Sequence, residues 1–536
     1  MSTVIAPVVT PTTRSYQQVR EALLARREIA LLDVREEAPH AIAHPLFAAN
    51  LPLSQLELLV YSRIPQRDTS IVVLDDGEGL AELAALRLLA LGYHDVAILA
   101  GGVSGWQAAG GELFQDVNAP SKAFGELVES RRHTPSLSAQ ELQALLDEGA
   151  DLVVLDARRF DEYQNMNIPG SVSVPGAELA LRVRALAPHP ETRVVVNCAG
   201  RTRSIIGTQS LLNVGIPNRV QALRNGTIGW TLAGQRLAHG SRRSFAAEVA
   251  PAARQQAAVD ARAVADRAGV KRCTWQNLSV LRQDAGRNTY LFDVRTPQEY
   301  ESGHAAGFLS APGGQLVQET EAHVPVRGAR IVLLDDDGVR ANMTASWLAQ
   351  MAWEVYVLDG VAVQQFSETG TSVPALPPAP WSEKISPATL AAWLQNPAST
   401  VVLDFSSSAN YVKQHIPGAW WVLRSQLPQV WPQLPVAERY VLSCGSAVLA
   451  SYAIADVAAL TDKPVFLLAG GNAAWKQAQH PLESGETALA SARIDRYRRP
   501  YEGTDNPASA MQAYLDWEYG LVEQLGRDGT HGFFVI

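Results

Sequence analysis

The chain repeats one pattern of apolar runs four times, and this repetition constrains its fold more than any other feature. In each repeat a first apolar run ends in aspartate, at Asp33, Asp156, Asp293 and Asp404. A second apolar run ends at or just before one marked residue, which is Asp75, Cys198, Asp335 and Cys444 in turn. The aspartate and the marked residue are 42 residues apart in three repeats and 40 apart in the fourth. A third run then closes on a glycine, at Gly102, Gly226, Gly360 and Gly471.

Continuously apolar strands that alternate with helical stretches are typical of a parallel sheet covered on both faces. Two repeats also open with helix-start signals, because Ser138 precedes Glu141 by three residues and Pro387 follows Ser386. The sequence therefore predicts an α/β fold of four tandem domains, each a parallel sheet flanked by helices on both faces. We expect these domains to span residues 1–120, 130–240, 271–368 and 381–485.

The remaining segments are predicted to be helical. Residues 241–270 are rich in alanine and indicate a linker helix, and residues 486–536 form a C-terminal helical tail. Within that tail, a terminal helix over 507–525 is expected to dock on the body of the protein. The tryptophans that follow the third apolar run are expected to be core residues: Trp106, Trp230 and Trp475.

The composition argues against several classes of protein. A net charge of −9 over 536 residues is unlike that of a nucleic-acid-binding protein. No apolar stretch approaches the roughly 20 residues of a membrane span, and Met1–Arg14 lacks the pattern of a secretory signal. The three cysteines have no metal-ligand spacing and suit reduced thiols. We expect a cytoplasmic protein with no metal, no cofactor, and neither a nucleic acid nor a membrane as partner.

The residues from Cys198 to Ser204 combine a thiol, a glycine and two arginines directly after a predicted strand. A turn of this kind lets backbone N–H groups converge on a negative charge. A sulfur atom held there is favoured as the nucleophilic thiolate. We therefore interpret Cys198 as a catalytic nucleophile, with Arg201 and Arg203 attracting an anionic substrate.

Several further motifs occur in order around Cys198. They are Asp161-Glu162-Tyr163, Ile168-Pro169-Gly170-Ser171, the cysteine loop, Gly226 and Trp230, with related pieces at 293–300, His304 and 415–419. Together they resemble the rhodanese (thiosulfate sulfurtransferase) superfamily in four tandem copies. The resemblance implies that Cys198 takes a sulfane sulfur from thiosulfate or a related donor, becomes a persulfide, and passes the sulfur to cyanide or a thiol.

The remaining candidates for substrate binding lie in or near the same loop. Ala199, Gly200 and Thr202 would contribute loop N–H groups alongside Arg201 and Arg203. Arg158 is also a candidate, although an ion pair with Asp156 that braces the loop is the interpretation we favour for it. Four residues separate Cys198 from Arg203, whereas related cysteine phosphatases have five, and the smaller loop suits a sulfur atom better than a phosphate.

The other repeats depart from this pattern. Asp75 and Asp335 stand where a cysteine is needed, so the first and third domains are predicted to be inactive packing partners with acidic loops that repel anionic donors. Cys444 is a second catalytic candidate, but its loop has no arginine, and its Cys-Gly-Ser opening looks like the mercaptopyruvate sulfurtransferase branch. Cys273 lies outside any loop motif and is predicted to be a buried apolar residue.

Three functions remain open from the sequence. The leading one is a thiosulfate sulfurtransferase that uses a small anionic donor. The second is a sulfur carrier or scaffold that relays persulfide to a partner protein without turnover, because two of the four domains lack cysteine at the marked position. The third is a phosphatase or arsenate reductase on the same fold, which the loop length disfavours.

Overall fold

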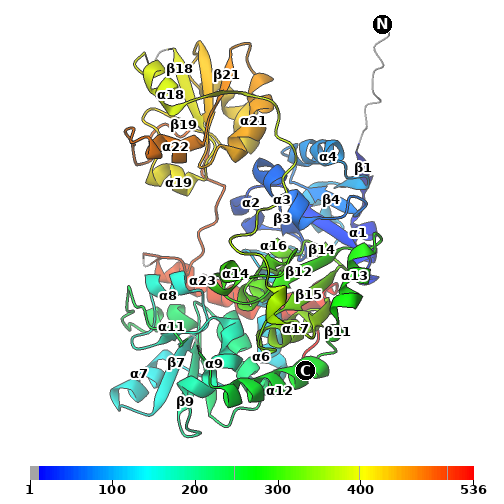
Figure 1. Cartoon of the computed structure of the whole chain (residues 1–536), viewed down its shortest axis with the longest axis vertical. Helices are drawn as coiled ribbons and strands as arrows, with labels where there is room; N and C mark the ends of the chain where they lie inside the picture. Colours follow the sequence, from blue (N-terminus) through cyan, green and yellow to red (C-terminus); the bar gives the residue numbers. More distant parts are fainter. Residues whose placement is uncertain (1–10, 247, 397–398, 504) are drawn as a thin grey trace.

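The computed structural model describes residues 11–246, 248–396, 399–503 and 505–536, and these form four units that each contain one mainly parallel sheet (Figure 1). The strands of the first unit are β1 (Thr12–Arg14), β2 (Ile29–Asp33), β3 (Ala49–Asn50), β4 (Ile71–Leu74) and β5 (Val96–Leu99). Those of the second are β6 (Ser136–Leu137), β7 (Leu152–Asp156), β8 (Val172–Ser173), β9 (Arg193–Asn197) and β10 (Val220–Leu223). Those of the third are β11 (Lys271–Cys273), β12 (Thr289–Asp293), β13 (Leu309–Ser310), β15 (Arg330–Leu334) and β16 (Glu354–Leu358). Those of the fourth are β17 (Glu383–Ile385), β18 (Thr400–Asp404), β19 (Trp420–Trp421), β20 (Arg439–Ser443) and β21 (Val465–Leu468).

Helices cover the faces of each sheet. The first unit has α1 (Tyr16–Leu24), α2 (Glu37–Ile42), η1 (Leu53–Gln55), α3 (Leu56–Arg63), α4 (Leu80–Ala90) and α5 (Gly102–Ala108). The second has α7 (Ala139–Asp147), α8 (Phe160–Asn165), η2 (Gly176–Glu178), α9 (Leu179–Leu186), α10 (Thr202–Asn213) and α11 (Gly226–Leu232). The third has α13 (Trp275–Gln283), α14 (Pro297–Ser302), α15 (Gly313–Gln318), α16 (Thr320–His323), α17 (Arg340–Gln350) and η3 (Val363–Gln365). The fourth has α18 (Pro387–Trp393), α19 (Ser408–Lys413), η4 (Arg424–Gln426), α20 (Leu427–Val430), η5 (Trp431–Gln433), α21 (Val448–Ala458) and α22 (Gly471–Gln477).

The four sheets share one strand order, which confirms the predicted fold class. In the second unit the order is β6-β10-β9-β7-β8, and the other three units repeat it. The strand that precedes each marked residue is therefore the central one, and its carboxyl end lies at the same edge in every unit. One pairing departs from the repeat, because β14 (Val326–Arg327) runs antiparallel beside β2 and joins the third unit to the first.

Local capping explains where several helices begin. Ser138 accepts a hydrogen bond from the N–H of Glu141 at 3.2 Å, and the Glu141 carboxylate accepts one from the N–H of Ser138 at 2.6 Å. Ser386 caps α18, which has Pro387 in its first turn. Both predicted helix starts are confirmed, since each cap satisfies an N–H group that the helix itself leaves free.

Three connecting segments do more than link the units. Helix α12 (Pro251–Arg267) is shorter than the 241–270 helix predicted, and it contributes buried alanines to a core shared with α9 and α17. Helix α6 (Ala119–Arg132) fills the stretch between the first two predicted domains and is buried over most of its length. The tail forms two helices, α23 (Ala508–Tyr519) and α24 (Leu521–Asp528), which meet at Gly520 in place of the single helix predicted.

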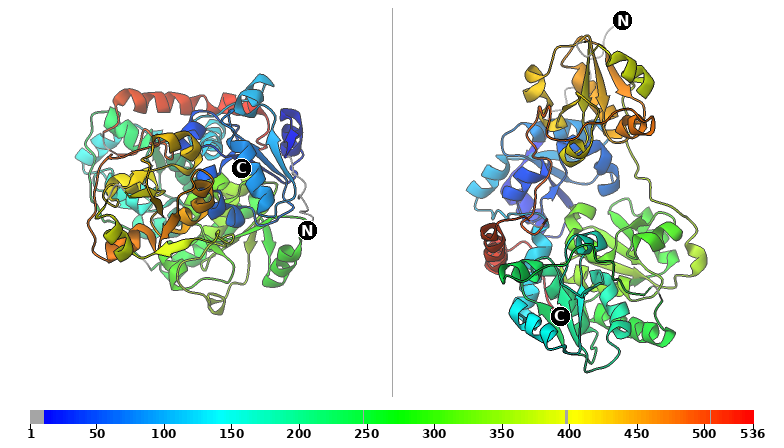
Figure 2. Two further views of the ribbon diagram at one scale, coloured as in Figure 1. Left: turned by 90° about the horizontal axis from the view of Figure 1, so that it is seen from above. Right: turned by 90° about the vertical axis from the view of Figure 1, so that its left-hand side faces the viewer.

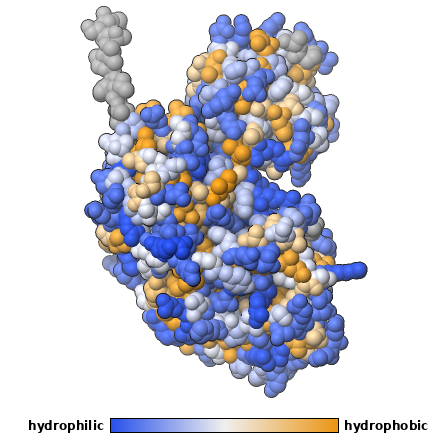
Figure 3. All heavy atoms as spheres, turned by 180° about the vertical axis from the view of Figure 1, so that it is seen from behind, coloured by the Kyte–Doolittle hydropathy of each residue, from blue (hydrophilic) through white to orange (hydrophobic). Residues whose placement is uncertain are grey.

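The units pack in two pairs through equivalent segments. Helix η1 of the first unit meets η4 of the fourth, and η2 of the second meets α15 of the third. Each pair thus combines a unit with aspartate at the marked position and a unit with cysteine. Figure 2 shows the fourth unit on top of the first, away from the other pair. From behind, the fourth unit is a separate lobe, and hydrophilic residues cover most of the face (Figure 3).

The tryptophans and one cysteine lie where the sequence predicted. The exposed fraction is at most 2% for each of the three tryptophans, Trp106, Trp230 and Trp475. Cys273 lies in β11 within an apolar cluster, and burial raises the pKa of its thiol to about 11.

Within the part of the chain that the structure describes, no helix has the length and apolar composition needed to cross a membrane.

A buried arginine contributes to the contact between the first and fourth units. The Arg424 guanidinium donates to both carboxylate oxygens of Glu57, at 2.6 and 3.0 Å, and to Asp456 at 2.6 Å. We predict that Arg424→Ala lowers stability by about 3 kcal/mol, because Glu57 then keeps only the longer pair with Arg87, at 3.7 Å, in a buried interface. Calorimetric melting tests this. Arg262→Ala, which breaks the exposed pair with Asp359, should cost at most about 1 kcal/mol, and equal melting temperatures for the two variants would contradict the interpretation.

Candidate functional site

Cys198 lies at the carboxyl end of the central strand β9, in the loop that leads into helix α10. The carbonyl of Cys198 accepts a hydrogen bond from the N–H of Thr227 at 2.9 Å, and that of Ala199 accepts one from Ile228 at 3.0 Å. A Cβ atom on Gly226 would lie 2.3 Å from the Cys198 carbonyl oxygen, and the φ angle of Gly226 is +53°. The glycine that closes the third strand is therefore required for the cysteine loop to rest on α11.

The Cys198 thiol is almost completely buried, with 2% of the residue exposed. Burial raises the pKa of the thiol, and the charge of Glu518 raises it further. Arg203 and the hydroxyl and N–H of Ser204 act in the opposite direction and lower this pKa. The structure differs here from the expectation of a favoured thiolate, because the desolvation of a closed site outweighs the positive charge and the loop N–H groups.

The two loop arginines are held by carboxylates. Arg203 donates to both oxygens of Glu162 at 2.8 Å; although burial opposes ionisation of Glu162, Arg203 lowers the pKa of this carboxyl to about 2. Arg201 donates to both oxygens of Glu126 at 2.7 and 2.8 Å and also pairs with Glu129. Both arginines thus keep their charge beside the loop, but each already has an anionic partner.

Arg158 has the bracing arrangement that we favoured. Its guanidinium donates to both oxygens of Asp156, at 2.8 and 2.7 Å, and to the carbonyl of Met166 at 2.6 Å. The first and third units repeat this pair as Asp33–Arg35 and Asp293–Arg295. The pair recurs in units that have no cysteine at the marked position, which indicates that it stabilises the strand end in all three.

The C-terminal tail covers the Cys198 loop. Ala199 belongs to an apolar cluster with Tyr501, Met511, Tyr514 and Leu515, and helix α23 packs against α6 and α11. Gly200 lies beneath α23, because a Cβ atom built on it would be 3.1 Å from the Tyr514 ring. Docking of the terminal helix is confirmed, but the sequence did not indicate that its target is the cysteine loop.

A cavity of about 340 Å³ lies beside the loop. It reaches Arg203 and Tyr501, and four further arginines line it: Arg158, Arg159, Arg496 and Arg499. Four carboxylates also line this cavity, so the charges of the five arginines are nearly balanced: Asp161, Glu162, Glu319 and Glu502. Thr202, by contrast, begins α10 and lines a separate apolar cavity between the second and third units.

Cys444 occupies the equivalent position after β20, but its surroundings are different. The N–H groups of Ala450, Ser446 and Leu449 face the thiol and lower its pKa, while burial, the larger effect, raises it. Gly445 and Ser446 are exposed, and a Cβ atom on Gly445 would meet nothing within 4 Å. The Cys444 loop is therefore open where the Cys198 loop is covered.

In the first and third units a carboxylate occupies the equivalent position. Asp75 accepts hydrogen bonds from the N–H groups of Gly77 and Ala81 at 3.2 and 3.1 Å. Asp335 accepts from Gly338 and Ala341 at 3.0 and 2.8 Å. Each of these carboxyl groups thus occupies the N-terminal end of a helix. Burial, together with the charge of Asp337, raises the pKa of Asp335 well above its usual value.

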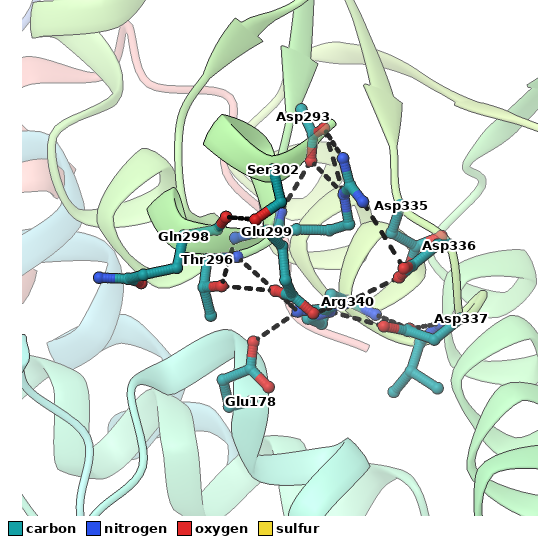
Figure 4. Close-up of polar contacts among 12 residues, drawn as sticks. Glu178, Asp293, Thr296, Gln298, Glu299, Ser302, Asp335, Asp336, Asp337 and Arg340 are labelled. Atoms are coloured by element: carbon teal, nitrogen blue, oxygen red, sulfur yellow. Dashed lines mark hydrogen bonds and ion pairs between the residues drawn. The ribbon is translucent and has the colours of Figure 1, made fainter. Parts of the chain in front are cut away.

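The third unit also neutralises its acidic loop with Arg340. Figure 4 shows this guanidinium among Asp336, Asp337, Glu299 and Glu178, and the contacts measure 2.6–2.9 Å. Glu178 belongs to the second unit, so the loop contributes to the contact between units. Our expectation that this loop repels anions neglected the buried arginine within it.

The structure brings Cys198, Ala199, Gly200, Arg201 and Arg203 together at one loop, and it places Cys444 in the other lobe. Sequence reasoning missed the residues that complete the Cys198 site, which are Glu126, Ser204, Tyr501, Tyr514 and Glu518. Of these residues, only Ser204 could have been found from the sequence, because it lies within the cysteine loop motif. Among the described residues, no group of three or more His, Cys, Asp and Glu side chains is arranged to hold a metal ion.

Comparisons with known proteins agree on one family. The profile of the rhodanese-like domain matches residues 15–109, 138–233, 277–362 and 386–478. A crystal structure of thiosulfate sulfurtransferase from Pseudomonas aeruginosa is 67% identical, with a TM-score of 0.97 over 98% of this chain and 100% of that one. Thiosulfate sulfurtransferase of Azotobacter vinelandii is 26% identical over 34% of this chain and 74% of its own length. An uncharacterized 16.5 kDa protein of Synechococcus elongatus is 50% identical over 46 residues, which is 8% of this chain and 31% of that protein.

The covering of the two loops leads to a prediction about their reactivity. At pH 9, iodoacetamide should modify Cys444 several times faster than Cys198, because Gly445 and Ser446 are exposed whereas Ala199 and Gly200 lie under the tail. Peptide mass spectrometry over a time course measures both rates. Faster modification of Cys198 would show that the tail does not shield it.

The charge of Arg203 should set the ionisation of Cys198. In Arg203→Met the thiol loses the cation that lowers its pKa. The pKa should therefore rise, and alkylation at pH 9 should slow by about tenfold, which corresponds to one pKa unit. The matched control is Arg159→Met, which removes an exposed partner of the same Glu162. If both variants react at the same rate, Arg203 does not act on the thiol.

Proposed function

The chain belongs to the rhodanese-like domain family, and we propose that it is a thiosulfate sulfurtransferase that carries the transferred sulfur on Cys198. The observation that carries the proposal is the 67% identity, over almost the full chain, with an enzyme of that name. Cys198 is the candidate nucleophile because its loop combines a thiol, the N-terminal end of α10 and the nearby charge of Arg203.

The proposed reaction has two steps. The Cys198 thiolate attacks the outer sulfur of thiosulfate, a new S–S bond forms, and sulfite leaves with the electron pair of the bond that breaks. The persulfide that remains is anionic, and the positive end of α10 and Arg203 stabilise it. Cyanide or a thiolate then attacks the outer sulfur, and the Cys198 thiolate is released.

The arginine-lined cavity is the proposed access route for the donor. It adjoins the loop at Arg203, and its five arginines offer paired N–H donors to the oxygens of an anion, although four carboxylates also line it. Because burial raises the pKa of Cys198, the thiolate fraction and the rate of the first step should grow as pH rises above neutrality.

Three unpaired cysteines suit a reducing compartment, and we propose the cytoplasm as the location of the enzyme.

Cys444 supports a second candidate activity. Its loop offers three N–H donors and an open approach but has no arginine, so a donor with a different charge, such as mercaptopyruvate, would suit it better. The tail over Cys198 supports the alternative of a sulfur carrier, because a covered persulfide is protected until a partner protein displaces the cover.

Cyanide-dependent thiocyanate formation tests these assignments. With thiosulfate as donor, Cys198→Ser should lose at least about a thousandfold of the activity, since the nucleophile is gone. Cys444→Ser is the matched control and should retain thiosulfate activity. The same assay with mercaptopyruvate assigns the role of Cys444.

Two results would overturn the proposal. Thiosulfate activity that survives in Cys198→Ser and disappears in Cys444→Ser would move the site to the fourth unit. A wild-type protein that accepts sulfur from thiosulfate but never turns over would favour the carrier function.

A further inference from the structure

Glu518 on helix α23 is a buried carboxyl group that faces the Cys198 loop. None of the residue is exposed, and its Oε1 accepts a hydrogen bond from the Tyr514 hydroxyl at 2.8 Å. Its Oε2 has no hydrogen-bond partner among the described residues. This oxygen lies over the loop, because a Cβ atom built on Gly200 would be only 3.3 Å away from it.

The charged groups around Glu518 come from three elements. Helix α6 contributes Lys122 and Glu126, the cysteine loop contributes Arg201 and Cys198, and Tyr514 lies one turn away on α23. Both cations already have closer partners, since Lys122 pairs with Asp116 at 2.9 Å and Arg201 pairs with Glu126. Burial, followed by the charge of Glu126, therefore raises the pKa of Glu518 to about 8, against the smaller opposing effects of Lys122, Tyr514 and Arg201.

A protonated Glu518 is an O–H donor that lacks an acceptor among the described residues. Burying such a group without a partner is unfavourable, so the position suits an acceptor that arrives with a substrate. The proposed reaction brings one, because a sulfane sulfur transferred to Cys198 carries negative charge at this loop. Tyr514 binds the other oxygen of the carboxyl and so directs Oε2 toward Gly200.

We propose that Glu518 is a catalytic residue which, in its protonated form, donates a hydrogen bond to the anionic sulfane sulfur that Cys198 receives. This inference rests on the proposed function and adds a residue from the C-terminal tail to the site. The tail then has a chemical role beyond covering the loop, since it supplies a neutral donor where a charged carboxylate would repel the substrate.

The proposal fixes the shape of the pH profile. Below pH 8, the rate with thiosulfate should rise about tenfold per pH unit as the Cys198 thiol ionises. Above pH 8, Glu518 loses its proton and repels the dianion, so the two titrations oppose each other and the profile flattens. Glutamine keeps an N–H donor and cannot ionise. The rate of Glu518→Gln with thiosulfate should therefore continue to rise above pH 8.

The experiment measures kcat/KM for thiosulfate between pH 6.5 and 9.5 in the thiocyanate assay. We expect the ratio of Glu518→Gln to wild type to increase about tenfold between pH 7 and pH 9. Glu518→Ala, which has no donor, should lose about tenfold or more at pH 7. The control is Asp516→Asn, two residues away on the exposed side of α23, and its profile should match the wild type.

A Glu518→Gln profile that flattens at pH 8 like the wild type would overturn the inference and leave the proposed function intact. Full activity of Glu518→Ala at pH 7 would do the same. If Glu518→Ala does not fold, the pH profile of kcat/KM for the isosteric variant Glu518→Gln is sufficient to test the inference. A wild-type protein that forms no thiocyanate at any pH would instead contradict the proposed function, and the role of Glu518 with it.

Discussion

A polar side chain that faces the N-terminal end of one helix is the feature around which every unit of this protein is arranged. The central strand ends, the loop turns, and backbone N–H groups of the following helix point at the marked side chain. In the first and third units the carboxylates of Asp75 and Asp335 accept hydrogen bonds from these N–H groups. In the second and fourth units a thiol occupies that position and leaves the N–H groups available for a sulfur anion.

The Cys198 site is completed by parts of the chain that are remote in sequence. Helix α6 supplies the carboxylates that hold Arg201, and Tyr501 and helix α23 cover the loop. The Tyr519 hydroxyl also accepts a hydrogen bond from Arg201 at 3.1 Å. The arginines near the thiol thus hold neighbouring segments together through ion pairs, and the cysteine itself lies covered. In contrast, the Cys444 loop lies in a separate lobe and is open.

The sequence was sufficient for the fold and for placing Cys198 directly after a central strand, because both depend on local patterns. The patterns that predicted them are local in sequence: apolar strands, helix caps such as Ser138, and the spacing from Asp156 to Cys198. What the sequence could not supply were contacts between distant segments. Nothing near Glu518 indicates that it lies over Gly200, and nothing near Arg201 indicates that α6 neutralises it. The expectation that Cys198 is a thiolate also came from the loop alone. Burial of the thiol instead raises its pKa.

The central claim is that Cys198 carries the sulfur, and the most direct measurement is where sulfur appears on the protein. The wild-type protein is incubated with thiosulfate, its thiols and persulfides are trapped by alkylation, and the peptides are analysed by mass spectrometry. The account predicts one additional sulfur atom on the peptide that contains Cys198. A Cys198 peptide that stays unmodified while sulfur accumulates on Cys444, or on neither cysteine, would contradict it.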